Sequence, residues 1–433
     1  MNCWHKHWGR AMSEPTKTFV PNLRFPEFRE APAWRADLLK NISPSIFDGT
    51  HQTPRYTENG IPFFSVENII SGNKNKFISL EDHKAATSKN KPEQGDILIT
   101  RIGNIGFSTI INWDYEFSIY VTLALIKKSD KFIPYYLHSY FQSGRYQSEI
   151  LKKSLLNAVP CKINMDELRT TEVLLPTEKI EQQKIADCLS SIDELITAQT
   201  KKIAALKDHK KGLMQQLFPA EGETVPKLRF PEFQDAGEWE EKALGDLSQI
   251  VRGGSPRPID EYITSDIIGL NWLKIADVDK ESKYVTFTKE KVLPTALSKT
   301  REVNPGDLIM SNSMSFGRPY ILKIKSCIHD GWIAVTQINE RASRDYLYYL
   351  ILSPISQEYF INNAAGSGVQ NLNADIIKLL PVLIPKLKEQ QKIADCLSSI
   401  DELITTQIQK LEAFKTHKKA MMQQLFPNPV EAY

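Results

Sequence analysis

Segments rich in glycine, asparagine, serine, threonine and basic residues interrupt apolar runs in both halves of the chain. They lie at 48–56, 73–76, 101–106, 252–257, 280–283 and 311–318. Side chains of these types on loops contact the phosphates and base edges of DNA. Each loop by itself also fits an ordinary solvated turn, but its recurrence at matching points of two otherwise divergent halves favours a DNA-binding interpretation.

The candidate DNA contacts are the polar, basic and aromatic side chains of these loops, together with one lysine beside them. They are Thr50, His51, Thr53, Arg55, Tyr56, Lys74, Lys76, Arg101, Asn104, Ser255, Arg257, Lys274, Lys283, Asn312, Ser313 and Arg318. A lysine on a phosphate is expected to strengthen binding to every sequence, whereas an arginine on a guanine is expected to select one base. None of these residues is expected to catalyse a reaction.

Signatures of enzymes are weak or missing in the sequence. It has no GxxxxGK[ST] phosphate loop, no Asn/Asp-Pro-Pro-Tyr methyltransferase run and no HExxH metal motif. Asp277, Asp279, Glu281 and Lys283 loosely imitate a metal-dependent nuclease site, but the other half has no counterpart to them. The sequence therefore predicts recognition without catalysis and no metal or cofactor bound by this chain. A single-chain nuclease or methyltransferase is the alternative.

An internal repeat must position these loops. Residues 181–219 align without a gap with residues 389–427, and both copies begin with EQQKIADCLSSIDELIT and end with MQQLFP. The sequence LRFPEF, at 23–28 and 228–233, marks the start of each module. An offset this long indicates a duplicated module and not a solenoid. Similar frames with divergent middles suggest one task performed twice on two different objects.

Apolar residues recur every seven positions in both copies, in two series offset by four, which is the a and d pattern of a coiled coil. The apolar seam residues are Ile185, Leu189, Ile192, Ile196, Ile203, Leu206, Ile393, Leu397, Ile400, Ile404, Leu411 and Phe414. Prolines 176 and 385 precede the two helices, and prolines 219 and 427 end them. Each copy therefore predicts one long helix whose partner is the other copy. Packing of each helix on its own domain is the alternative.

Two lysines in the seam decide the orientation of the pair. A parallel pair in equal register would place Lys210 against Lys418 in one desolvated layer, whereas an antiparallel pair separates them. The antiparallel pair is therefore predicted, with one globular body at each end of a rod. From Ile185 to Leu217 the seam spans about 48 Å at ~1.5 Å per residue, or roughly fourteen base pairs of duplex DNA.

Two bodies lie between the repeated segments, and we call residues 21–176 the first body and residues 226–385 the second body. Both combine short β-rich runs with tyrosine-rich segments, 135–147 and 346–359, that have the pattern of amphipathic helices. The predicted fold class is α+β, with two pseudo-repeated mixed domains, each followed by a long helix, and an antiparallel coiled coil of the two helices. The predicted divisions are a disordered tail at 1–20, the first body at 21–176, a helix at 177–219, a linker at 220–225, the second body at 226–385, a helix at 386–427 and a tail at 428–433.

The composition fits a globular protein with room for two or more domains. Of the 433 residues, 41% are hydrophobic and 24% are charged, and no apolar run approaches the length of a membrane span. The first residues lack the features of a signal peptide, and Met12 looks like a more natural start than Met1. The five cysteines form no CxxC pair, which fits a reducing cytosol. We therefore expect a cytoplasmic protein.

The LRFPEF opening, the glycine-aspartate turns at 95–96 and 306–307, and the EQQKIADCLSSID…QQLFP helices together resemble the specificity subunits of type I restriction–modification systems. The resemblance covers residues 21–427, in both halves. It implies two target recognition domains and two helical conserved regions that pair antiparallel, with each domain reading one half of a split, asymmetric DNA site. The first body has the familiar stretch DGTHQTPRY, whereas the second has GGSPRP, so the two targets should differ.

The resemblance also implies partners and cofactors. Two methyltransferase subunits would dock on the helices and bodies, and restriction/translocase subunits would join that core on double-stranded DNA. S-adenosylmethionine, ATP and magnesium are expected in those partners, while this chain would be a non-catalytic recognition subunit that binds no membrane. The alternatives are the specificity subunit of a related methyltransferase-only or fused restriction system, or a coiled-coil protein-binding scaffold.

Overall fold

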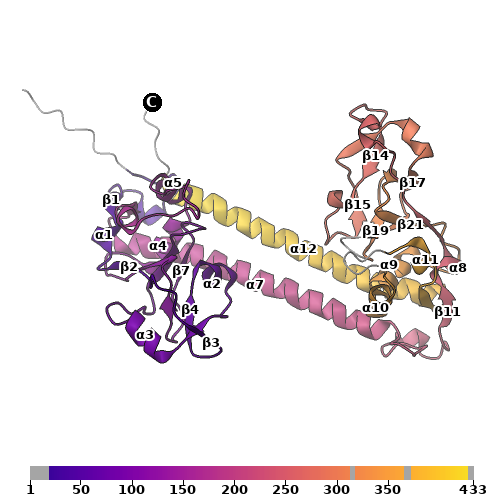
Figure 1. Cartoon of the computed structure of the whole chain (residues 1–433), viewed down its shortest axis with the longest axis horizontal. Coiled ribbons are helices and arrows are strands. Elements are labelled where there is room, and N and C mark those ends of the chain that lie inside the picture. Colours follow the sequence, from indigo (N-terminus) through magenta and orange to yellow (C-terminus); the bar gives the residue numbers. More distant parts are fainter. Residues whose placement is uncertain (1–18, 313–316, 365–371, 428–433) are drawn as a thin grey trace, which may run out of the picture. The chain divides into compact units, whose positions relative to one another are not determined.

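The computed structural model describes residues 19–312, 317–364 and 372–427, so most of the predicted tail at 1–20, the tail at 428–433 and the candidate Ser313 lie outside it. The chain forms two compact units, which we call the first unit (Met1–Thr200 with Lys410–Tyr433) and the second unit (Lys201–Gln409). Each unit contains one body and one segment of each long helix (Figure 1). No helix within the described residues is long and apolar enough to cross a membrane.

The two long helices are α7 (Lys179–Leu217) and α12 (Leu387–Leu425). In the first unit, Leu189 of α7 lies in a buried cluster against which Met421 of α12 packs. In the second unit, Leu217 of α7 shares a buried cluster with Ile393 of α12. Within each unit the early part of one helix therefore lies beside the late part of the other, which confirms the predicted antiparallel pair (Figure 1).

The predicted seam is removed from solvent along both helices. Ile185, Leu189, Ile192, Ile203, Ile393, Leu397 and Ile404 are buried, and Ile196, Leu206, Ile400, Leu411 and Phe414 are half-buried. The two seam lysines each pair with an aspartate on the facing helix: Lys418 with Asp193 at 2.7 Å, and Lys210 with Asp401 at 2.6 Å. The antiparallel pair therefore separates the lysines and also neutralises each one, because the aspartates are repeat equivalents of each other.

The first body is built from two four-stranded sheets. In spatial order the first sheet is β2 (Ile46–Asp48), β9 (Leu123–Ile126), β6 (Ile97–Thr100) and β7 (Ser108–Ile110), and the second is β3 (Tyr56–Thr57), β5 (Phe77–Ile78), β4 (Ile61–Phe64) and β8 (Ser118–Ile119). Its helices are α1 (Leu39–Ile42), α2 (Val66–Ser71), α3 (Leu80–Ala86), α4 (Pro134–Phe141), α5 (Gly144–Lys152) and α6 (Met165–Arg169). β1 (Arg35–Leu38) and β10 (Glu172–Leu175) pair antiparallel at the ends of the body.

The second body repeats this order with one more strand at an edge of each sheet. Its sheets run β12 (Gln249–Arg252), β21 (Trp332–Thr336), β18 (Leu308–Ser311), β19 (Pro319–Leu322), β15 (Tyr284–Val285), and β13 (Ile263–Thr264), β16 (Glu290–Val292), β14 (Leu270–Leu273), β20 (Ser326–Ile328), β17 (Arg301–Val303). β11 (Glu240–Ala243) pairs with β22 (Pro381–Ile384), and the helices are α8 (Leu244–Leu247), α9 (Arg344–Leu352), α10 (Pro354–Asn363) and α11 (Ala374–Lys378).

Alternating side chains of the central strands bury both faces of the first sheet in each body. In the first body, Ile97 and Ile99 pack with Tyr136 of α4, whereas Leu98 on the opposite face packs with Phe64 of the second sheet. The layers are therefore helices, sheet and sheet, which confirms the α+β prediction. Strands buried on both faces read as continuous apolar runs, as observed at Ile97–Thr100.

The tyrosine-rich segments each form two helices, so the prediction of one continuous helix in each was wrong. Ser143 separates α4 from α5 because its side chain accepts a hydrogen bond from the backbone N–H of Tyr146 and caps the second helix. Ser353 separates α9 from α10 in the same way, and Pro354 favours a new helix start.

Buried polar contacts attach the opening of each module to its long helix. Arg24 donates two hydrogen bonds to Glu181, at 2.8 and 2.7 Å, and Arg229 donates two to Glu389, at 2.7 and 2.8 Å. The four side chains are between 1% and 8% exposed. Bidentate arginine–carboxylate pairs have a restricted geometry, so each pair fixes the module opening against its helix.

The glutamine that follows each of these glutamates positions an earlier helix of the same body. The side-chain oxygen of Gln182 accepts from the backbone N–H of Ile133 at 3.0 Å, at the start of α4. The oxygen of Gln390 accepts from Ser343 at 2.8 Å, at the start of α9. The repeated EQQ motif thus holds both the module opening and the start of α4 or α9.

Candidate nucleic-acid interface

The candidate loops of the first body meet where β2 and β6 end beside the turn that joins β8 to β9. Asp48, the last residue of β2, accepts from His51 at 3.1 Å and from Arg101 at 3.2 Å. Thr53 lies 3.2 Å from the hydroxyl of Tyr120, which belongs to the β8–β9 turn. His51 and Thr53 are exposed, whereas Arg101 is buried. We call residues 48–53, 101 and 120–121 the first polar edge.

The second body has a polar edge at the equivalent place, formed by residues 252–257, 312 and 329–331. Here Asp330, in the β20–β21 turn, accepts from Ser255 at 2.8 Å and pairs with the exposed Arg257 at 3.5 Å. Its backbone carbonyl accepts from Arg252 and from Asn312, both at 3.0 Å. The hydrogen bond from Ser255 is the main reason that the pKa of Asp330 lies below its ordinary value.

Both polar edges require a glycine directly after the first strand. A Cβ added to Gly49 would lie 2.0 Å from the carbonyl oxygen of Ile119, and one added to Gly253 would lie 2.1 Å from that of His329. The strand end therefore runs against the backbone of the neighbouring turn. This close approach brings loops that are distant in sequence into one surface.

The remaining candidates of the first body lie on other loops. The ammonium group of Lys74 lies 3.8 Å from the centre of the Tyr115 ring, and Lys76 pairs with Glu67 at 3.0 Å. Asn104 is exposed on the β6–β7 turn, and Arg55 and Tyr56 are exposed beyond the first polar edge. Thr50 is half-buried, and its backbone N–H donates to Ile119. Contact of these residues with DNA stays a prediction.

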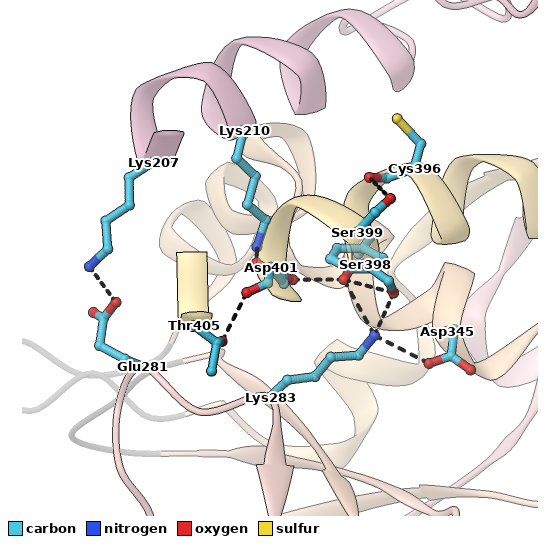
Figure 2. Close-up of polar contacts among 11 residues, drawn as sticks. Lys207, Lys210, Glu281, Lys283, Asp345, Cys396, Ser398, Ser399, Asp401 and Thr405 are labelled. Atoms are coloured by element: carbon cyan, nitrogen blue, oxygen red, sulfur yellow. Dashed lines mark hydrogen bonds and ion pairs between the residues drawn. The ribbon is translucent and has the colours of Figure 1, made fainter. Parts of the chain in front are cut away.

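The remaining candidates of the second body differ in environment. Lys274 pairs with Glu290 at 2.6 Å, and Arg318, the residue before β19, is half-buried. Lys283 departs most from the expectation of a solvated loop residue, because its side chain is only 10% exposed. Figure 2 shows it reaching Asp345, at 3.3 Å, and Ser398 of α12, at 3.0 Å. This burial lowers the pKa of the Lys283 ammonium group.

The structure assigns Lys283 and Glu281 to the attachment of the second body. Glu281 pairs with Lys207 of α7 at 2.7 Å, so the 281–283 loop contacts both long helices within the second unit (Figure 2). The two side chains point to different helices, which does not fit a shared metal. No group of three or more histidine, cysteine, aspartate or glutamate side chains in the described parts of the chain is arranged to hold a metal ion.

Several residues of the polar edges were not among the candidates. Asp48 and Arg252 stand at the start of loops whose other members were chosen, whereas Tyr120 and Asp330 belong to turns that were not considered. The sequence could have indicated these two turns, because each directly precedes an apolar run that forms a central strand. Only the pairing of β2 with β9 and of β12 with β21 places those turns beside the chosen loops.

Comparison with known proteins agrees with this arrangement. The type I restriction modification DNA specificity domain family matches residues 49–208 and again residues 236–413. The chain is 27% identical to the MjaX type I restriction enzyme specificity subunit of Methanocaldococcus jannaschii, over 94% of this chain and 96% of that one. It is 23% identical to the MjaVIII specificity subunit of the same organism, over 85% of this chain and 86% of that one.

Solved structures share the fold at low sequence identity. The type I restriction–modification S subunit from M. genitalium superimposes with a TM-score of 0.58 and 15% identity, over 94% of this chain and 99% of that one. A chain from a type I R-M system, solved to explain complex assembly and conformational transition, superimposes with a TM-score of 0.59, over 92% of this chain and 98% of that one. The two family matches cover most of each body and most of each long helix, and they include the second polar edge and all of the first except Asp48. The chain therefore belongs to the type I restriction modification DNA specificity domain family, as a DNA-recognition subunit with two target recognition domains.

Proposed function

We propose that this chain reads a split, asymmetric DNA site, with one half-site recognised by each body and an unread spacer between them. The observation that carries the proposal is the pair of polar edges. Both are built at the same place of the same strand order, yet they display different side chains. A homodimer of one body would require a palindrome, whereas two different bodies in one chain can read two different half-sites.

Exchange of one body tests this proposal directly. Residues 226–385 would be replaced by the equivalent body of a relative, and the methylated motif would be determined by sequencing host DNA with and without the variant. We expect the half-site of the second body to change while the other half-site stays the same. The reciprocal exchange of residues 21–176 is the matched control and should change only the other half-site. A change of both half-sites in either variant would refute the two-reader proposal.

We further propose that the chain acts in the cytoplasm and leaves chemistry to partner subunits. Two methyltransferase subunits would use S-adenosylmethionine, and restriction subunits would use ATP and magnesium. Support comes from family membership and from the attachment role of Glu281 and Lys283, the residues that imitated a nuclease site. Purified chain alone should neither cut nor methylate DNA, and addition of the cognate methyltransferase should produce sequence-specific methylation. Cleavage by the chain alone would contradict this assignment.

A further inference from the structure

Each unit has a basic cleft where a body meets the late part of a long helix. In the second unit the cleft has a volume of about 370 Å³ and is lined by Lys207, Lys210 and Lys211 of α7, with Arg318 from the body. In the first unit it has a volume of about 710 Å³ and is lined by Lys415, Lys418 and Lys419 of α12, with Arg145 of α5. The helix lysines are repeat equivalents, so the same cleft occurs twice.

The arginines of the two clefts come from different positions. Arg318 follows the β18–β19 turn, and Phe107 follows the corresponding turn of the first body. Arg145 lies on α5 and has Ile355 as its counterpart on α10. Both clefts therefore combine three helix lysines with one arginine, although the two bodies supply that arginine from different elements.

Four of the six lysines are neutralised by carboxylates. Figure 2 shows Lys207 reaching Glu281 and Lys210 reaching Asp401. In the first unit, Lys415 pairs with Glu412 at 2.8 Å and Lys418 pairs with Asp193 at 2.7 Å. Lys211 and Lys419 are exposed and have no ion pair within the described residues. One free ammonium group remains at each cleft.

Each cleft also contains an incompletely bonded guanidinium group. The Nε of Arg318 and the Nη1 of Arg145 are buried without a hydrogen-bond partner among the described residues. The charge of Arg145 is offset by Glu172, which accepts from its Nη2 at 2.6 Å, so the free positive charge of the first cleft is that of Lys419. A buried donor without a partner costs about 1–3 kcal/mol, so such groups in native proteins call for a ligand or water. A free ammonium group beside an under-bonded guanidinium group is suited to an oxyanion of phosphate type.

We propose that these two clefts bind phosphate groups of the DNA backbone without sequence preference. This inference rests on the proposed DNA-reading function and adds the long helices to its binding surface. DNA is favoured over an acidic protein because the backbone carbonyl of Arg318 accepts from Ser311 at 3.2 Å, next to Asn312, which belongs to the second polar edge. A phosphate contact there would continue the interface of the body onto the helix.

The test compares two double variants of the full-length chain. Lys211→Gln with Lys419→Gln removes the free charge of each cleft, and Lys201→Gln with Lys202→Gln removes the same charge from exposed positions of α7 outside the clefts. The affinity for a duplex of random sequence and for the cognate duplex is measured as a function of salt. Loss of two phosphate contacts should lower the slope of log K against log salt by about 1.8, and should weaken binding about eightfold per lysine at ~0.1 M salt.

The expected outcome is an equal loss on both duplexes for the cleft variant, with the control variant close to wild type. Equal binding by wild type and cleft variant would overturn the phosphate assignment and leave the proposed function intact. Loss on the cognate duplex alone would also overturn it, because it would indicate base recognition. Normal DNA binding with loss of methyltransferase association would instead assign the clefts to protein docking. Failure of wild type itself to bind any duplex, alone or with its methyltransferase, would refute the proposed function.

Discussion

The two polar edges have matching backbones, but their acidic and basic side chains occupy exchanged positions. In the first body the strand before the glycine ends in Asp48, and the residue that hydrogen-bonds to the following turn is Arg101. In the second body the same strand ends in Arg252, and the carboxylate is Asp330 of the turn. The backbone contacts match. The N–H of Gly49 donates to the carbonyl of Leu123, and the N–H of Gly253 donates at 2.8 Å to the carbonyl of Trp332, the equivalent strand residue. The backbone thus supports either charge arrangement, which leaves the side chains free to suit different DNA.

The contacts between module openings and helices show no such freedom. Arg24 with Glu181 and Arg229 with Glu389 have the same atoms, distances and burial. These contacts determine where a body sits on its helix, whereas the polar edge determines what the body displays. The residues that position each body on its helix are therefore distinct from the residues that we propose contact DNA.

The largest effect is expected from breaking the positioning contacts. Arg229→Met leaves the carboxylate of Glu389 buried without its partner and should lower the free energy of unfolding by about 3–5 kcal/mol. Arg24→Met should have a cost of similar size, because Glu181 keeps a hydrogen bond from Trp34 at 3.1 Å while the carbonyls of Ala31 and Pro32 also lose their donor. Urea unfolding measures the cost of each substitution, and hydrogen exchange identifies the unit that opens.

The control for this pair of variants is Lys184→Met, which removes an exposed ion pair with Glu27 from the same helix. Little change in stability is expected there. A cost for Lys184→Met as large as that for Arg24→Met or Arg229→Met would contradict the positioning role of the buried pairs.

A smaller effect is expected from the seam pairs. Asp401→Leu leaves Lys210 in the seam without its acceptor and also removes the hydrogen bond that Tyr349 donates at 2.7 Å. It should cost at least about 1.5–3 kcal/mol, the usual value for one hydrogen bond to a charged group. A double-mutant cycle with Lys210→Met should give a clear coupling energy. The matched cycle of Asp401→Leu with Lys211→Met should be additive, because Lys211 forms no ion pair with any residue that the structure describes. Coupling in the second cycle and not in the first would contradict the register of the helices.

The stability of the first unit should depend on pH through His138. Burial, and next the charge of Lys418, lower the pKa of His138 from 6.5 to about 4. Neutral His138 accepts from Gln142 at 2.8 Å, and Gln142 in turn accepts from Lys418 at 3.4 Å. The unfolded chain binds the proton more readily, so this stability is present above pH 6.5 and is lost as the pH falls towards 4.

At pH 5 the loss should be about 2 kcal/mol relative to pH 7. The urea midpoints of unfolding between pH 7 and pH 5 measure this loss. The His138→Gln variant should show a weaker dependence of stability on pH. The second body has Tyr348 at the equivalent place, and burial raises its pKa, so it stays neutral over this range. An unchanged pH dependence in His138→Gln would show that other groups dominate.

The smallest effect is expected from a circular permutation. In the second unit Leu228 donates to Gln216 at 2.9 Å, next to the linker at 219–225. In the first unit Leu23 donates to Gln424 at 3.0 Å, so the same contact forms between distant parts of the chain. New ends between Gly222 and Glu223, with a copy of residues 219–225 joining Phe426 to Pro21, should therefore change the free energy of unfolding by less than about 1 kcal/mol.

The measurement for the permuted chain is its urea midpoint together with its circular dichroism spectrum. A control that is opened between Gly222 and Glu223 without the joining linker should be much less stable, because it consists of two separate fragments that must associate. Failure of the joined form to fold would mean that the two units are less alike than their matching contacts indicate.

The sequence alone determined the duplication, the two long helices and their antiparallel pairing. Heptad spacing and the conflict between Lys210 and Lys418 are local or pairwise properties, so they can be derived without coordinates. The α+β class followed from the apolar runs for the same reason. The break within each tyrosine-rich segment was missed because Ser143 and Ser353 act as caps only when the next helix turns away.

Only the tertiary structure decided which residues meet at the polar edges and in the seam. Asp48 reaches Arg101 across more than fifty residues, Asp401 reaches Lys210 across almost two hundred, and Lys283 turns from its loop to α12. The composition of the first unit, from the first 200 residues and the last 24, was likewise settled by packing. The physical reason is that a hydrogen bond or ion pair depends on distance in space, whereas propensity and periodicity report only on neighbours along the chain.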